Sequence, residues 1–205
     1  MSQIEALDKS LFWWINSHYA TPLDWILWTF SQPWSWAVVI FVVYIFTTLR
    51  HDRKNWLWVL AGIGLCFLLA DQISNTVIKD GVQRLRPCYM YENGQIVKNE
   101  AVRLFHTGRG GHYGFVSSHA ANAFAIAMFI SLMYGGKKCD SRYKSPALPY
   151  ILMAWAAIVA YSRVYLGKHY PGDVACGALL GLGVGALLYF AISKIKLRIS
   201  SKSTA

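Results

Sequence analysis

Five long apolar segments constrain the fold of this chain more than any other feature of its sequence. Each holds 16–23 residues, close to the ~20 that a helix needs to cross the hydrocarbon core of a bilayer. They run over residues 34–49, 56–78, 116–134, 149–165 and 174–195. The sequence therefore predicts an all-α, polytopic membrane bundle of five to six transmembrane helices.

Residues 4–30 indicate a transmembrane helix less clearly, because polar residues and a proline interrupt their apolar stretches. We expect an amphipathic helix that lies in the membrane interface there, with a sixth crossing as the alternative. Glu5 and Asp8 precede the first apolar stretch, and no basic region stands before them. A cleaved signal peptide is therefore not expected.

The composition agrees with one membrane domain over residues 1–205. The chain is 55% hydrophobic and 15% charged, with nine tryptophans and twelve tyrosines, a balance typical of proteins in contact with lipid. Its formal net charge of +10 is spread between the apolar segments rather than along one stripe or tail. We therefore expect the lipid bilayer, and not a nucleic acid, as its partner; the oligomeric state stays open.

The four cysteines do not indicate a disulfide framework or a zinc site. Cys66, Cys88, Cys139 and Cys176 show no CxxC spacing, and the expected topology separates them. Neither a bridge nor a metal cluster is expected from such a pattern.

Basic residues gather in three connections, which predicts the orientation of the bundle. They are Arg50, Arg53, Lys54, Lys137, Lys138, Arg142, Lys144, Lys194, Lys196, Arg198 and Lys202. Alternating helices place all three connections on one side, and the positive-inside rule makes that side cytoplasmic, together with the C-terminus. The connections 79–115 and 166–173 then face the periplasm or exterior of a bacterial inner membrane.

Three polar fragments lie at that outer end. In the first, Asp71, Asn75 and Lys79 are spaced by four residues, so they share a helix face that points into the bundle. Arg86-Pro87 follows, and the proline would end or kink the helix. Lysine and arginine at this place suit phosphate binding, although ordinary snorkelling of flanking cations is the alternative.

The second fragment is Ser117-Ser118-His119, at the start of an apolar segment. Free N–H groups at a helix N-terminus favour a bound anion, and His119 would point at it. Simple capping by a serine, with a satisfied histidine beside it, is the alternative.

The third fragment holds Arg163, His169 and Asp173. If a helix begins near Val174, Asp173 can accept a hydrogen bond from His169, which sets the imidazole tautomer and activates the other nitrogen. Glycines continue from Asp173 at four-residue steps, at 177, 181 and 185. Such a stripe allows close packing inside the bundle, with a homodimer seam as the alternative.

Together the fragments read Lys79-x6-Arg86-Pro87, Ser117-x-His119 and Ser162-Arg163-x5-His169-x3-Asp173. In order, spacing and membrane context this pattern resembles the signature of the type-2 phosphatidic acid phosphatase family. That superfamily also includes vanadium haloperoxidases and soluble bacterial acid phosphatases. The resemblance covers residues 79–173 and implies a haloperoxidase-like helical core.

The resemblance also implies roles. His169 would attack phosphorus to form a phosphohistidine, Asp173 would orient it, and His119 would serve as general acid and then base. The phosphate would be bound by Lys79, Arg86, Arg163, Ser117 and Ser118. No metal or other cofactor is implied, because the cations of the protein would neutralise the phosphate.

One position departs from the family pattern. The middle block is usually Pro-Ser-Gly-His, and here Ser118 stands in place of the glycine. Its Cβ lies where the backbone approaches phosphate, and its hydroxyl adds a further hydrogen-bonding group. The reaction class stands, but the detailed geometry and the substrate preference are open to change.

An outward-facing site at helix ends suits a lipid phosphate whose chains stay in the bilayer. Candidate substrates are undecaprenyl diphosphate, phosphatidylglycerol phosphate and phosphatidic acid, with lipid A phosphates as the alternative. The loop 88–115 is a candidate for substrate choice, above all through Arg109 and His112. A solvated lid is the alternative interpretation of the same residues. A soluble haloperoxidase, a transporter and a lipid-phosphate-binding protein without activity are less consistent with these residues.

Overall fold

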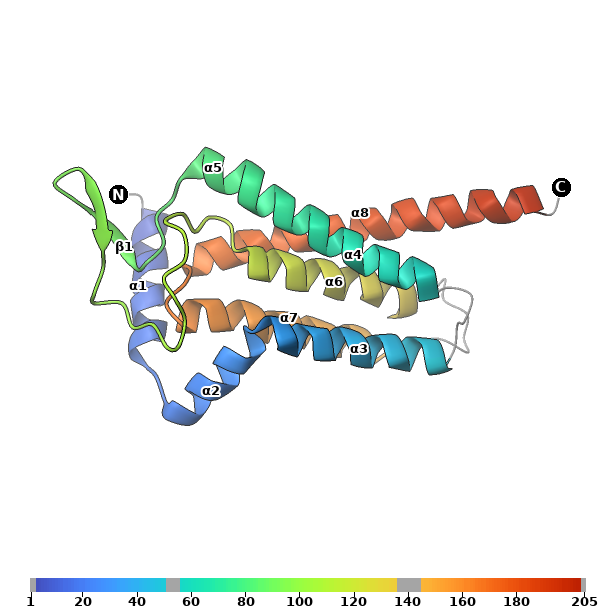
Figure 1. Ribbon diagram of the computed structural model, residues 1–205, viewed down its shortest axis with the longest axis horizontal. Coiled ribbons are helices and arrows are strands. Elements are labelled where there is room, and N and C mark those ends of the chain that lie inside the picture. Colours follow the sequence, from blue (N-terminus) through green and yellow to red (C-terminus); the bar gives the residue numbers. More distant parts are fainter. Residues whose placement is uncertain (1–2, 51–55, 136–144, 204–205) are drawn as a thin grey trace.

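The computed structural model describes residues 3–50, 56–135 and 145–203 and is built mainly from helices (Figure 1). The helices are α1 (Gln3–Ser17), α2 (Thr21–Phe30), α3 (Pro33–Arg50), α4 (Trp56–Gln72), α5 (Lys79–Val82), α6 (Ser118–Gly135), α7 (Leu148–Tyr165) and α8 (Pro171–Ser203). A π-helical stretch, η1 (Ile73–Ile78), joins α4 to α5. The all-α expectation has one exception, a short antiparallel hairpin of β1 (Tyr89–Glu92) and β2 (Gln95–Lys98).

Helix α6 is the centre of the bundle and packs against α8, α7 and α4. Its many alanines, among them Ala121, Ala123, Ala125 and Ala127, are fully buried. Small side chains allow neighbouring helices to approach α6 from several directions. This arrangement carries the start of α6, with His119, into the middle of one end of the bundle.

The glycine stripe of α8 belongs to this packing. A Cβ on Gly181 would come within 2.2 Å of the Ala121 carbonyl oxygen, and one on Gly185 within 2.3 Å of the Ala125 carbonyl oxygen. These glycines therefore let α8 lie directly on the backbone of α6. Internal packing is confirmed as their role, and the surface that they occupy is filled by α6.

The described residues contain fewer candidate membrane-spanning helices than the five to six that the sequence predicts. Among the described residues, 3 helices are long and apolar enough to cross: Trp56–Val82, Leu148–Tyr165 and Pro171–Ile199. The count rises to 4 if Thr21–Phe30 and Pro33–Ile45, bent by 63°, form one broken span. Helix α6 is not among them, because the polar residues at its start lower its mean hydropathy. The prediction of five to six spans is not confirmed by this measure.

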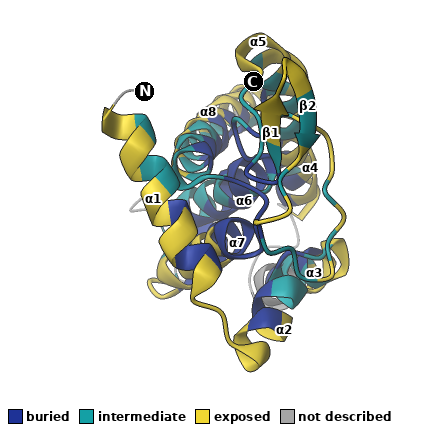
Figure 2. Cartoon of the chain, turned by 90° about the vertical axis from the view of Figure 1, so that its left-hand side faces the viewer, coloured by how far each residue is buried: buried dark blue, intermediate teal, exposed yellow. Residues whose placement is uncertain are grey.

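The N-terminal region contains two helices where one was expected. Helix α1 lies across one end of the bundle, and α2 follows at an angle to it (Figure 2). Ile4, Leu7 and Trp14 are exposed on α1, whereas Phe12 and Ile15 are buried. Apolar side chains therefore occupy both the buried and the exposed faces of α1, and an amphipathic helix in the membrane interface stays a prediction.

The three polar fragments lie at the same end of the bundle as α1. Figure 1 shows the loops 83–117 and 166–170 at this end, with the C-terminal end of α8 at the other. Most basic residues of the two connections predicted to be cytoplasmic, at 51–55 and 136–144, lie outside the described residues, as does Cys139. The other three cysteines, Cys66, Cys88 and Cys176, are free.

Candidate active site

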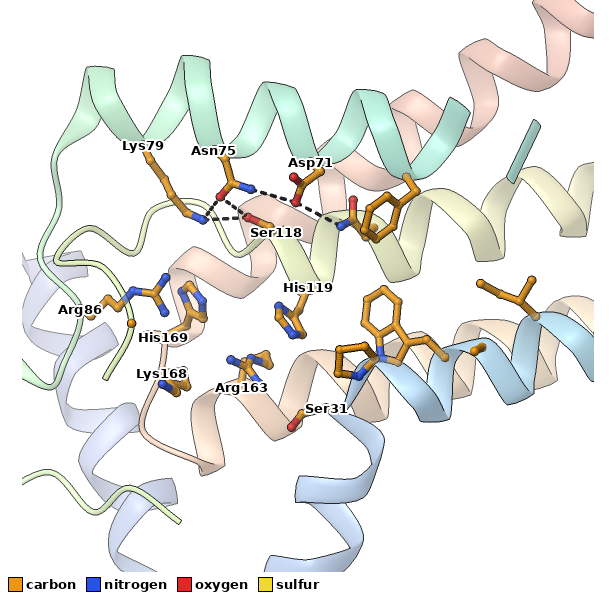
Figure 3. A pocket seen from close by; sticks show the side chains of 17 residues that line it. Ser31, Asp71, Asn75, Lys79, Arg86, Ser118, His119, Arg163, Lys168 and His169 are labelled. Atoms are coloured by element: carbon orange, nitrogen blue, oxygen red, sulfur yellow. Dashed lines mark hydrogen bonds between the residues drawn. The ribbon is translucent and has the colours of Figure 1, made fainter. Parts of the chain in front are cut away.

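A cavity of about 570 Å³ at this end of the bundle joins the three fragments (Figure 3). The predicted residues that line it are Lys79, Arg86, Ser118, His119, Arg163 and His169. Ser117 and Asp173 lie behind this lining, and both are fully buried. The tertiary structure thus brings residues that are 90 positions apart in the sequence into one compartment.

Lys79 is held by a hydrogen-bonded ladder on one face of the α4–η1–α5 helix. Asn75 Nδ2 donates to Asp71 Oδ1 at 2.8 Å, and Lys79 Nζ donates to Asn75 Oδ1. Asn122 Nδ2, on α6, reaches the same Asp71 oxygen at 3.5 Å. The expected common face is confirmed, and it holds the ammonium group of Lys79 at the cavity wall.

Ser118 completes this ladder. Its hydroxyl accepts a hydrogen bond from Lys79 Nζ at 2.7 Å and donates one to Asn75 Oδ1 at 2.8 Å. The residue that departs from the family pattern therefore positions the ammonium group of Lys79 at the cavity wall. Ser117 lies one residue earlier, and its Oγ has no hydrogen-bond partner among the described residues. Side-chain capping of α6 by Ser117 is thus not observed.

Arg86 reaches the cavity from the loop that follows α5. The helix ends at Val82, and Gln83 takes a left-handed conformation with φ 51°, so the chain turns before Pro87. Arg86 Nε donates to the Tyr113 carbonyl at 3.1 Å. This contact fixes the direction of the side chain and leaves the two terminal nitrogens of the guanidinium for a ligand.

Arg163 and Lys168 supply two further cations, of which Lys168 was not predicted. They are 7% and 5% exposed, and neither forms a salt bridge within the described part of the chain. Burial, followed by repulsion from Arg163 and Arg86, lowers the pKa of Lys168 to about 8. Its place directly before His169 in the third fragment was the signal that could have identified it.

His169 lies against Asp173, but at a longer distance than a hydrogen bond. His169 Nδ1 is 3.6 Å from Asp173 Oδ2, and both side chains are almost fully buried. Burial, and then the positive charge of Arg86, lower the pKa of His169 well below its ordinary value. The imidazole is therefore neutral at neutral pH, which is the form that acts as a nucleophile.

His119 stands at the N-terminal end of α6, and Trp36 of α3 packs against it edge-on. Their ring centroids are 5.6 Å apart. The indole bounds the apolar side of the cavity, which is also formed by Pro33, Ala37, Ile40 and Phe67. The cavity thus has a cationic end and an apolar side, with His119 between them.

The two loop residues proposed for substrate choice point elsewhere. Arg109 pairs with Glu100 at 2.7 Å and donates to the Cys88 carbonyl at 3.3 Å. The ring of His112 packs edge-on against Tyr89, with centroids 4.7 Å apart. Neither residue is part of the cavity lining, whereas Gly110 is, so a substrate contact by Arg109 or His112 stays a prediction.

The charge balance favours an anion. Lys79, Arg86, Arg163 and Lys168 line the cavity, and Asp71 is the only carboxylate in that lining. Asp71 is itself engaged by Asn75 and Asn122. In the described residues, no group of three or more His, Cys, Asp and Glu side chains is arranged to hold a metal ion. Clustered donors in a partly water-excluded cavity bind and stabilise phosphate-like charge strongly.

Comparisons with known proteins agree with this geometry. Lipid A 4'-phosphatases from Bacteroides thetaiotaomicron and Porphyromonas gingivalis are 31% and 28% identical over 95% and 92% of this chain, covering 81% and 74% of those proteins. The crystal structure of a PAP2-type phosphatidylglycerolphosphate phosphatase from Bacillus subtilis has the same fold, with a TM-score of 0.62, 21% identity, and coverage of 97% of this chain and 89% of that one. The model of the PAP2 superfamily matches residues 56–196. The chain therefore belongs to the PAP2 superfamily.

Proposed function

We propose that this membrane lipid phosphatase removes a phosphate from a lipid headgroup through a phosphohistidine intermediate, without a metal ion. The observation that carries the proposal is the convergence of two histidines and four cations in one cavity with an apolar side. The cationic end suits a phosphate, and the apolar side suits the lipid that carries it.

In the first step, the free nitrogen of His169, Nε2, attacks phosphorus while Nδ1 faces Asp173. The bond between phosphorus and the lipid oxygen breaks, and His119 donates a proton to that oxygen. In the second step, water attacks the phosphohistidine, His119 takes a proton from the water, and inorganic phosphate and neutral His169 are released. The side chains of Lys79, Arg86, Arg163 and Lys168 would stabilise the charge on the transferring group.

For the substrate, we propose a lipid A phosphate first. The sequence alone favoured undecaprenyl diphosphate, phosphatidylglycerol phosphate and phosphatidic acid, but similarity to two lipid A 4'-phosphatases over most of their length supports the alternative. The positive-inside pattern supports a periplasmic active site and a cytoplasmic C-terminus.

The test is phosphate release by the purified protein in detergent with a metal chelator present. The panel contains lipid A, phosphatidylglycerol phosphate, phosphatidic acid and undecaprenyl diphosphate. We expect release without added metal, fastest from lipid A. Activity that needs an added metal would contradict the metal-free mechanism, and a preference for another lipid would contradict the substrate assignment.

We expect substrate binding to weaken at alkaline pH because of Lys168. With a pKa of about 8, its ammonium is charged below that pH and neutral above it. Because kcat/KM reports the free enzyme, kcat/KM should fall as the pH rises through about 8. The measurement is a pH profile of kcat/KM with phosphatidic acid.

Two variants test the assignment to Lys168. Lys168→Arg keeps its charge at all these pH values, so its alkaline decline should be weaker than that of wild type. Lys168→Met loses a charged donor, and KM should rise about 10-fold or more even near neutral pH. A wild-type decline that persists unchanged in Lys168→Arg would assign it to another group.

A further inference from the structure

Asp173 is held by a second charged residue that the sequence pattern did not single out. Arg84 Nη1 donates to Asp173 Oδ1 at 2.7 Å, while the Tyr170 N–H donates to Oδ2 at 3.0 Å. The carboxylate is fully buried and therefore depends on these two donors for its orientation. Its Oδ2 is the oxygen that faces His169 Nδ1.

Arg84 is in turn held by α1. Its other terminal nitrogen, Nη2, donates to Asp8 Oδ2 at 2.6 Å. Asp8 Oδ1 accepts the N–H of Gly172 at 2.7 Å, in the first turn of α8. One planar guanidinium therefore bridges a carboxylate on α1 and a carboxylate on α8, which lysine cannot do in the same geometry.

Aromatic rings stabilise the same bridge. The guanidinium carbon of Arg84 lies 4.4 Å from the centroid of the Tyr170 ring, and Phe12 of α1 packs edge-on against that ring at 5.2 Å. Tyr170 directly follows His169, so α1 contacts the loop 166–170 through Phe12 and the start of α8 through Asp8. None of these residues lines the substrate cavity except His169.

We propose that Arg84 and Asp8 are positioning residues that orient Asp173, and through it the nucleophile His169. The inference rests on the phosphohistidine mechanism proposed above. In this arrangement α1 is part of the catalytic unit, since Asp8 joins it both to Arg84 and to the start of α8. A small movement of Asp173 would turn the His169 ring away from the line of attack, which is costly even without any loss of substrate contact.

The experiment measures kcat, KM and inhibition by inorganic phosphate with a short-chain phosphatidic acid in detergent. We expect Arg84→Gln to lower kcat about 100-fold and Asp8→Asn about 10-fold, with KM and the inhibition constant of phosphate within about twofold of wild type. Arg84→Lys should recover part of the loss, because lysine still reaches one carboxylate. Glu5→Gln, on the same helix, is the control and should match wild type, because Glu5 pairs with Lys9 at the surface.

A double variant separates positioning from a general loss of structure. If Arg84 acts through Asp173, Arg84→Gln should add no more than about twofold to the loss caused by Asp173→Asn. If the kcat loss of the double variant equals the product of the two single losses, the proposal is overturned. A rise in KM and in the phosphate inhibition constant, instead of a fall in kcat, would also overturn it. If Arg84→Gln does not fold, Arg84→Lys and Asp8→Asn make the same comparison in the Asp173→Asn background.

The wild type and His169→Ala, assayed in parallel, keep the two proposals apart. A wild type without phosphatase activity, or a His169→Ala variant that is as active as wild type, contradicts the proposed function. An active wild type with an inactive His169→Ala and a fully active Arg84→Gln contradicts only the role of Arg84.

Discussion

Replacing His169 with alanine should lower kcat by about 10⁴-fold or more, because the covalent route then has no nucleophile. Water would then have to attack the phosphate directly, although the cations of the cavity still bind it. No base would activate that water on the side from which His169 attacks. Because those cations remain, KM should change much less than kcat. Phosphate release from the preferred lipid, followed over hours at high protein concentration, measures the residual rate.

The loss is interpretable only if the fold is retained. His169 is 2% exposed, so truncation to alanine leaves a buried cavity beside Asp173. We therefore expect a somewhat lower melting temperature in detergent, with one cooperative unfolding transition retained. His119→Asn is the companion variant: loss of the general acid should lower kcat by about 10²–10⁴-fold. Wild-type rates in His169→Ala would exclude the phosphohistidine mechanism.

The largest expected effect on stability comes from a single methyl group at Gly181. Its Cβ would lie 2.2 Å from the Ala121 carbonyl oxygen and 2.9 Å from the Ala125 nitrogen, and both are backbone atoms of α6. Backbone cannot swing aside as a side chain does, so the two central helices must separate. Gly181→Ala should therefore destabilise the protein by about 3 kcal/mol, the upper part of the range for overpacking.

A matched control lies two residues further along the same helix. A Cβ on Gly183 meets nothing within 4 Å, so Gly183→Ala introduces no clash. The higher helix propensity of alanine should raise the free energy of unfolding by about 1 kcal/mol. Thermal unfolding in detergent should show a lower midpoint for Gly181→Ala and an equal or higher one for Gly183→Ala. Equal midpoints for the two variants would contradict close contact between α8 and α6.

Most of the cavity lining named from the sequence was predictable because these residues stand in short, spaced fragments. Lys79, Arg86, His119, Arg163 and His169 were all named from the sequence, and all line the cavity. The shared face of Asp71, Asn75 and Lys79 followed from helical spacing and is observed. Local periodicity is sufficient for such predictions, since it does not depend on how distant segments pack.

Contacts between distant segments were not predictable in the same way. Arg84 and Lys168 stand beside motif residues, but nothing in their spacing tells that one turns toward Asp173 and the other into the cavity. Arg109 was a reasonable candidate on charge, yet Glu100 and the Cys88 carbonyl engage it. The span count stays unconfirmed, because hydropathy alone does not separate an apolar segment at the centre of a bundle from one that faces lipid.

The sequence by itself determined the family signature, the helical membrane character and the candidate residues of the cavity. These follow from residue type and spacing along one chain. Only the tertiary structure decided that Asp8 joins α1 to Arg84 and to the start of α8, and that Ser118 hydrogen-bonds with Lys79. These contacts form only when distant helices pack around α6. The spacing of the residues along the sequence therefore does not predict them.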